Sequence, residues 1–423
     1  MTSAAIGEVA RALVGVMAFI GLAWALSEDR RSFAPRTVAF GLLGQIVIAI
    51  VLTRLPAIAA GFGALARGVD ALQASAGAGA TFVFGYLGGG AQPFVMAPGN
   101  PSTFIFGLQV LPAVLLVSAI AAVLWHWGIL RWIVRGAAWA FGRAFGVSGP
   151  VGVSTSACIF LGMVEAPLLV RPLLPLLSRG EIFIIMVDGL SVIAGSTMIL
   201  LGAMLGSHLP DAFTHLLTAS LISTPMAIVM ARIIVPSPIV RGGASIPLAS
   251  PYRSSLDAMT HGTINAVKVA AYVVAMLIVF VGTIALVDKI LAALPIANHS
   301  LSLGGIFGWL FAPFAWLMGV TSGDYVAVGS LLGTKVAANE VVAYGRLVAL
   351  PPGTLSAKSE LIATYALCSF GNLGSVAILI GTLAAMAPEK AEEVVQLGPK
   401  AIAAAFLTTC MTGTIIGLLD TLF

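Results

Sequence analysis

Stretches of about twenty apolar residues recur along the whole chain, and no other feature restricts its fold as strongly. A helix needs roughly 20 apolar residues to cross the hydrocarbon core of a bilayer. Charged residues make up only 9% of the 423 residues and hydrophobic residues 59%, whereas an ordinary soluble domain carries about 25% charged residues. We therefore expect an all-α, multi-pass integral membrane protein without a large soluble domain.

Seven segments predict transmembrane helices, because each is apolar and is bounded by charge, Pro or Gly. They are Val9–Leu26, Thr37–Leu52, Phe104–Trp127, Phe183–Leu205, Ala212–Val235, Ala266–Leu291 and Ala401–Leu419. Arg30, Arg31 and Arg36 crowd the first connection, so the positive-inside rule predicts a cytoplasmic loop and an external N-terminus. The net charge of +4 thus orients the chain and indicates no nucleic-acid partner.

Two further segments have the composition of amphipathic helices at the membrane surface. Leu55–Ala78 is rich in Gly and Ala and carries Arg67 and Asp70. Leu130–Gly146 alternates arginines with tryptophan and phenylalanine, a mixture expected at the level of the lipid headgroups. Both are predicted to lie at the interface.

Glycine and proline interrupt two other apolar segments, Val151–Leu177 and Leu303–Val320, and predict re-entrant hairpins there. A glycine-broken span follows each of them, Phe183–Leu205 and Tyr325–Leu350. Interrupted segments at corresponding places in two halves indicate a binding site near the middle of the membrane. The long polar connection Pro236–Gly262 should be the loop that separates the halves.

These patterns divide the chain into five parts. The predicted parts are residues 1–147 (N-terminal spans and interfacial helices, mainly scaffold), 148–235 (first transport half), 236–300 (loop and scaffold helix), 301–385 (second transport half) and 386–423 (C-terminal span).

Four of the 17 acidic residues fall in the apolar regions: Glu165, Asp188, Asp324 and Glu340. Ionisable groups inside a membrane are costly, so each indicates a function by default. Structural alternatives exist for two of them. Arg171 could be an ion-pair partner of Glu165, and Lys335 could be an ion-pair partner of Glu340.

Neutral polar residues follow in the second half, where Phe370, Asn372 and Ser375 lie close together in the sequence. Alone, this stretch could serve helix packing. Together with Glu165 and Glu340 it suits a neutral ligand that has several hydroxyls and a flat base. The sequence shows no nucleophile with its base, no metal-ligand cluster and no phosphate loop, so we predict neither an enzyme nor a bound cofactor.

At these residues the chain resembles the concentrative nucleoside transporter family. The matching blocks occur in one order: Gly162–Pro167, Leu168–Pro175, Ile193–Gly195, Ala275–Phe280, Phe311–Gly319, Leu331–Lys335, Asn339–Tyr344, Leu355–Ser356 and Ala363–Cys368. Similarity extends from about Leu55 to the C-terminus.

The resemblance implies a homotrimer in a bacterial cytoplasmic membrane. Each protomer would have eight transmembrane helices and two opposed hairpins in an inverted repeat, with elevator-like transport. Glu340, Asn372 and Ser375 match the ribose-binding positions, Phe370 matches an aromatic contact, and Glu165 matches the hairpin carboxylate. The complete predicted substrate set is Met163, Val164, Glu165, Thr197, Glu340, Phe370, Asn372 and Ser375.

Two departures from the family pattern concern selectivity and coupling. Met163 and Val164 stand where the family usually has Gln followed by Thr or Ser, which removes base-recognition hydrogen bonds. The positions that form the sodium site in sodium-coupled members fall on Cys158, Leu161, Val192 and Ile193. Sodium prefers oxygen ligands, and the thiol of Cys158 and the isopropyl group of Val192 offer none.

Proton coupling is therefore favoured over sodium coupling. A carboxyl group in an apolar pocket favours its neutral form, which suits a proton carrier. Glu165 is the main candidate and Asp188, where the family commonly has Gly, is the second. The predicted function is proton-driven nucleoside import. A sodium-coupled nucleoside symporter and a nucleoside-binding membrane sensor remain the alternatives.

Overall fold

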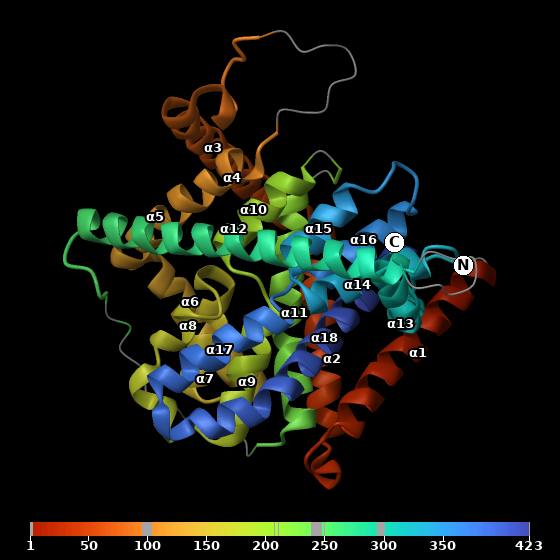
Figure 1. Ribbon diagram of the computed structural model, residues 1–423. Coiled ribbons are helices and arrows are strands. Elements are labelled where there is room, and N and C mark those ends of the chain that lie inside the picture. The colour runs from red at the N-terminus through yellow and green to blue at the C-terminus, as the bar shows by residue number, and fades with distance from the viewer. Residues whose placement is uncertain are drawn as a thin grey trace.

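Helices make up all the regular secondary structure in the described part of the chain (Figure 1). The computed structural model describes residues 3–94, 104–206, 208–209, 211–237, 248, 250–293 and 301–422. Within these residues, seven segments are long and apolar enough to cross a membrane: Ile6–Ala25, Pro35–Arg54, Phe106–His126, Arg179–Leu205, Ala212–Ile234, Ser255–Ala293 and Pro388–Leu422. The broken pair α16 (Ala357–Leu367) and α17 (Leu373–Met386) supplies an eighth apolar segment. The predicted all-helical membrane fold is confirmed.

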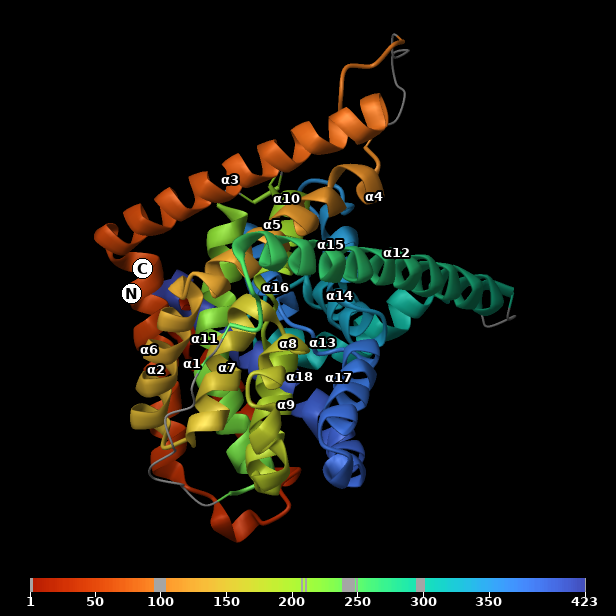
Figure 2. The same ribbon diagram turned by 90° about the vertical axis from the view of Figure 1, so that its left-hand side faces the viewer.

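The N-terminal part begins with α1 (Ser3–Ala25) and α2 (Pro35–Arg54), joined through the short η1 (Arg30–Ser32). The next elements are α3 (Pro56–Phe84), η2 (Gly85–Gly88) and α4 (Phe106–Gln109). Figure 2 shows α3 lying across one end of the helical bundle. This helix continues beyond the predicted Leu55–Ala78 segment.

The remaining helices repeat one order of elements. The first copy consists of α5 (Leu111–His126), α6 (Ile129–Phe145), a hairpin of α7 (Gly149–Leu161) with α8 (Glu165–Leu168) and η3 (Arg171–Leu176), the broken helix α9 (Arg179–Ser191) and α10 (Gly195–Leu205), and α11 (Ala212–Ile234). The second consists of α12 (Ser255–Ala293), α13 (Leu303–Leu317), a hairpin of α14 (Tyr325–Ala337) with α15 (Glu340–Val348), the broken helix α16 and α17, η4 (Pro388–Lys390) and α18 (Ala391–Leu422). Each copy contains three membrane crossings, so successive copies have opposite orientations.

The predicted position of the second hairpin is wrong. Most of the segment Leu303–Val320 forms one continuous helix, α13 (Leu303–Leu317), and the chain turns only after Leu317, where Gly319 and Gly323 have positive φ angles of 89° and 99°. The hairpin lies in the segment predicted as a broken span, Tyr325–Leu350. Its break falls at Asn339, whose side chain caps α15 by accepting a hydrogen bond from Val342 N at 2.9 Å. A side-chain cap can start a new helix directly after a break without the Gly or Pro that the prediction relied on.

Two other predictions are also wrong: the extent of the connection between the halves, and the depth of Asp324 in the apolar region. α12 begins at Ser255, so the connection between the halves is shorter than Pro236–Gly262, and residues 238–247 lie outside the described part. Asp324 is not deep inside the apolar region. It lies in the turn before α14 and accepts hydrogen bonds from Ser356 N and Oγ at 3.1 and 3.0 Å.

Packing separates the long helices into two groups. α1 and α2 pack against α11 and α18, whereas α5 packs chiefly along α12. Almost none of the apolar residues of α12 is buried within the chain, and Figures 1 and 2 show this helix crossing the outside of the bundle. The division into scaffold and transport parts stays a prediction.

Candidate functional site

The interruptions in both hairpins and both broken helices meet in the interior. Phe370 N, in the break between α16 and α17, donates to Val192 O, in the break between α9 and α10, at 3.4 Å. The tip of the first hairpin reaches the same place through Gly162, where an added Cβ would lie 2.9 Å from the Ala194 Cβ. Gly162 also has a φ of 96°, so both backbone conformation and space require glycine.

Glu340 and Asn372 are joined directly at this meeting point. Asn372 Nδ2 donates to Glu340 Oε2 at 3.0 Å; Asn372 is 1% exposed and Glu340 is 6% exposed. Asn372 Oδ1 also accepts a hydrogen bond from Ser375 N at 2.7 Å and so caps α17. The cap fixes the amide orientation, and the amide in turn orients the carboxylate. Phe370, which is partly buried, and Ser375 flank Asn372 on the same segment.

The first hairpin brings Met163, Val164 and Glu165 to the same region. Met163 Cβ would lie 3.2 Å from a Cβ added at Gly189, so the hairpin tip is packed against α9. Glu165 is partly buried and forms no ion pair with Arg171, so that structural alternative is not supported by the described residues. Thr197 lies in the first turn of α10, directly after the break, and is also partly buried.

Lys335 forms no direct ion pair with Glu340 among the described residues, although the two groups still interact electrostatically. The Lys335 ammonium group is completely buried and donates to Ala366 O and Thr409 Oγ1, both at 2.9 Å. The Ala366 carbonyl belongs to the last turn of α16, where carbonyl groups lack partners within the helix. Lys335 therefore supports the end of the helix that leads to Asn372, a role that the sequence prediction missed.

Tyr344 is another residue that the prediction missed. Its hydroxyl group donates to Thr364 O at 2.5 Å, which ties α15 to α16 behind the Glu340–Asn372 pair. The side chain is completely buried. Its signal in the sequence is a polar aromatic residue inside an apolar segment, because a buried tyrosine hydroxyl usually has a hydrogen-bond partner.

The four predicted cation positions lie beside the breaks but offer few side-chain oxygens. Cys158 is 2% exposed in the last turn of α7, while Val192 and Ile193 are fully buried in the break after α9. Leu161 ends α7. The neighbouring Ser191 hydroxyl donates to Val187 O of its own helix at 2.6 Å, which orients its oxygen and leaves the lone pairs of that oxygen available to a cation.

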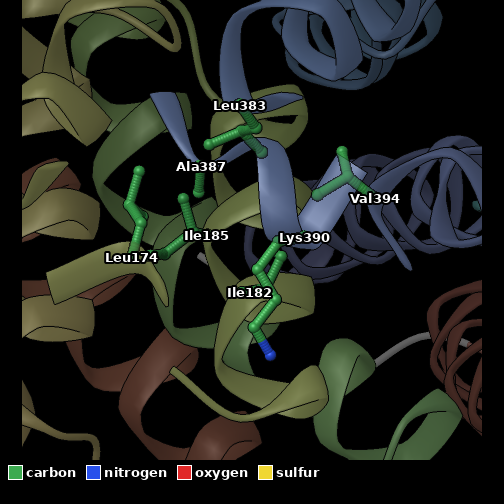
Figure 3. A pocket seen from close by; sticks show the side chains of 7 residues that line it. All are labelled: Leu174, Ile182, Ile185, Leu383, Ala387, Lys390 and Val394. Atoms are coloured by element: carbon green, nitrogen blue, oxygen red, sulfur yellow. The ribbon is translucent and has the colours of Figure 1, made fainter. Parts of the chain in front are cut away.

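An apolar hollow lies elsewhere and is unrelated to this chemistry. Figure 3 shows it between η3, α9, α17, η4 and α18, and none of the predicted site residues lines it. Its lining residues are Leu174, Ile182, Ile185, Leu383, Ala387, Lys390 and Val394.

Known sequence families match the chain in three segments. Residues 14–87 match the family described as the N-terminus of Na+ dependent nucleoside transporters, residues 107–208 match a nucleoside recognition (Gate) family, and residues 215–417 match the C-terminus of Na+ dependent nucleoside transporters. The chain belongs to the concentrative nucleoside transporter family. The resemblance predicted from the sequence is thus confirmed.

Full-length relatives of this family agree with the assignment. The chain is 31% identical to a nucleoside permease, NupC, of Helicobacter pylori over 96% of both chains. It is 35% identical to an uncharacterized transporter of Haemophilus influenzae over 97% of this chain and 98% of the relative. The structure of CNTnw in an inward-facing substrate-bound state matches with a TM-score of 0.88 and 32% identity, over 97% and 98% of the two chains. The chain is accordingly a multi-pass membrane transporter of the nucleoside transporter family.

Proposed function

We propose that this transporter imports nucleosides by cation symport and that the proton is favoured over sodium. The observation that carries the proposal is the hydrogen-bonded pair of Glu340 and Asn372 at the meeting point of the broken helices. A carboxylate can accept hydrogen bonds from the two ribose hydroxyls, while the adjacent amide can both donate and accept. The cap that Asn372 forms on α17 holds this arrangement ready for the ligand.

The second hydrogen-bonding surface for the nucleoside would come from the first hairpin. Glu165 supplies a carboxyl group, while Met163 and Val164 present a thioether and an isopropyl group. A base that contacts such groups finds few hydrogen-bonding partners. We therefore expect weak discrimination between base edges, or a preference for the larger purine surface.

The coupling proposal rests on the groups around the breaks. Cys158 and Val192 bring no side-chain oxygen for a sodium ion, whereas Glu165 and Asp188 are two carboxyl groups that could carry a proton. Backbone carbonyls remain available in the same region. Sodium coupling is therefore the alternative outcome of the test.

Several further features belong to the proposal. Relatives adopt inward-facing and outward-facing states, which supports alternating access by an elevator-like movement. We propose α5 and α12 as the centre of the scaffold, because they pack chiefly on each other. The exposed apolar surface of α12 would face lipid and the other subunits of a homotrimer in a bacterial cytoplasmic membrane.

The experiment is uptake of labelled uridine and adenosine into proteoliposomes that contain the purified chain. A pH gradient, acidic outside and without sodium, should drive accumulation that a protonophore abolishes. Uptake that requires a sodium gradient and ignores pH would overturn proton coupling. Counterflow, in which internal unlabelled nucleoside draws labelled nucleoside inward, separates a transporter from a sensor that only binds.

A further inference from the structure

Asp188 is a buried acidic side chain that forms no ion pair with any of the described residues. It is 1% exposed, and neither of its carboxyl oxygens has a hydrogen-bond partner among the described residues. An isolated ionised carboxylate in such surroundings is strongly unfavourable, because nothing replaces the water that it has lost. This conformation therefore fits the protonated form of Asp188, and the carboxylate belongs to states of the transport cycle in which water reaches it.

Few polar groups face Asp188. The groups that interact with Asp188 are Thr224 of α11 and Cys158 of α7. The Cys158 thiol also interacts electrostatically with Glu165 of α8. The Thr224 hydroxyl donates to Ser220 O of its own helix at 3.4 Å. The helix α17, which also packs on α9, contains no titratable side chain.

The basic groups on the other packed helices have partners elsewhere. On α11, Arg232 donates to the Phe145 and Gly146 carbonyls, eight residues along the helix from Thr224. On α18, Lys400 donates to Glu28 at 2.8 Å, and Cys410 is the buried titratable group further along. His215, near the start of α11, contacts the Tyr365 hydroxyl at 3.0 Å. Among the described residues, no basic side chain neutralises Asp188.

The position of Asp188 within its helix also disfavours a charge. It lies in the last turn of α9, a helix of 13 residues that ends at Ser191. The carboxyl end of a helix carries a partial negative charge, which repels an ionised carboxylate. A protonated carboxyl group has no such conflict. Glu165, in contrast, lies at the partly exposed hairpin tip, where it can serve the substrate.

Asp188 is mechanically connected to both halves of the candidate site. The next residue, Gly189, packs against Met163 at the hairpin tip. Four residues after Asp188, the Val192 carbonyl accepts the hydrogen bond from Phe370 N, two residues before Asn372. A change in charge at Asp188 would therefore alter the position of two segments. One is the hairpin tip at Met163, where the base is expected, and the other is the break at Phe370–Asn372, where the ribose is expected.

We infer that Asp188, rather than Glu165, is the group that carries the coupling proton. The carboxylate takes one proton from the outer solution, and the resulting neutral acid moves inward together with one neutral nucleoside. Its O–H bond breaks on the inner side and the proton passes to water. The carboxylate then returns with the empty carrier, so one positive charge enters per nucleoside. This inference rests on the proposed proton-coupled function.

The test compares Asp188→Asn with the wild type in proteoliposomes that contain a pH-sensitive dye. The amide resembles the protonated acid in size and polarity but cannot release a proton. We expect nucleoside counterflow to continue, while accumulation driven by the pH gradient and uridine-dependent acidification of the lumen are both lost. Asp188→Glu keeps a carboxyl group and should retain acidification. Glu389→Gln removes an exposed acid from η4 and should behave like the wild type.

Each outcome separates the two proposals. Proton-driven accumulation by Asp188→Asn would overturn the assignment of Asp188 and leave the proposed function intact. Loss of counterflow together with accumulation in this variant would assign Asp188 to binding or folding and would also overturn the inference. Sodium-dependent, pH-independent uptake by the wild type would refute the proposed coupling itself.

Discussion

The Asn372 amide donates to the Glu340 carboxylate at 3.0 Å, although 32 positions separate the two residues and a helix break precedes each of them. One residue begins the second arm of a hairpin and the other caps the second half of a broken helix. The bond thus joins two helix breaks that belong to different elements of the fold.

This relationship predicts the effect of Glu340→Gln. The neutral amide would replace two charge-assisted hydrogen bonds to ribose, about 1.5–3 kcal/mol each, by neutral ones of about 1 kcal/mol each. Nucleoside affinity should therefore fall roughly 10- to 100-fold, since every 1.4 kcal/mol is about tenfold. Isothermal titration calorimetry with uridine and adenosine measures the affinity of Glu340→Gln and of the wild type. Glu389→Gln is the matched control. An unchanged affinity would place the ribose elsewhere.

A second prediction concerns the support behind the pair. Lys335→Met leaves Ala366 O and Thr409 Oγ1 without the donor that they share. Each buried acceptor left unsatisfied costs about 1–3 kcal/mol, so the melting temperature should fall clearly. Lys289→Met, at an exposed position of α12, should not lower it. A variant as stable as the wild type would show that another group can replace the ammonium.

The sequence predicted the first hairpin well and the second badly, for one physical reason. Gly162 and Pro167 mark the first break in the sequence, because glycine tolerates a positive φ and proline cannot continue a helix. The second break has neither residue: α14 ends at Ala337, and the Asn339 side chain caps the start of α15. An asparagine within an apolar segment is the weaker signal that could have found it.

Partners of the polar residues were harder to predict than the residues themselves. The sequence indicated a function for Glu340 and Asp188, because a charged group inside a membrane is energetically costly. The sequence suggested Lys335 as the partner of Glu340, since the two are close along the chain. The structure places a helix-end carbonyl opposite Lys335 and an amide opposite Glu340. Such pairings depend on the tertiary crossing of the breaks, which spacing along one helix does not reveal.

A third prediction tests an ion pair outside the membrane. Arg179 donates to Glu28 at 2.9 Å and lowers the pKa of that carboxyl group to about 2, with Lys400 as a second partner. A carboxyl pKa lowered on folding stabilises the folded state above the usual value of 4.5. Glu28→Gln should therefore lower stability at pH 7, by about 1 kcal/mol or less because the pair is partly exposed.

The pH dependence of the stability difference between the wild type and Glu28→Gln tests this assignment. The difference between wild type and Glu28→Gln should stay constant from pH 7 to about 5 and shrink as the pH falls towards 2, where the wild-type carboxyl group also becomes neutral. Thermal unfolding in detergent at several pH values measures it. A difference that grows on acidification would contradict the assignment.

The cation positions give a fourth prediction. Cys158→Asn combined with Val192→Ser supplies two oxygen atoms beside the breaks, and oxygen is the ligand that a hard cation prefers. If the wild type lacks a sodium site, sodium chloride should raise the melting temperature of the double variant relative to choline chloride, by mass action on the folded state. The wild type should show no such difference. A sodium effect of equal size in both proteins would show that backbone carbonyls already suffice.

Base selectivity gives the last prediction, because the hairpin tip packs against Gly189 of α9 through Met163 rather than through a polar side chain. Met163→Gln with Val164→Thr would place an amide and a hydroxyl where the base is expected. A pocket with buried polar groups penalises any base that leaves them unpaired, whereas an apolar pocket discriminates weakly. Thermal shifts with a panel of purine and pyrimidine nucleosides should therefore be similar across the panel for the wild type and spread apart for the double variant. Since a changed base preference leaves the ribose contacts intact, ribose-free nucleobases should remain poor ligands of both proteins. Equal shifts across the panel in the double variant would mean that the base lies away from the hairpin tip.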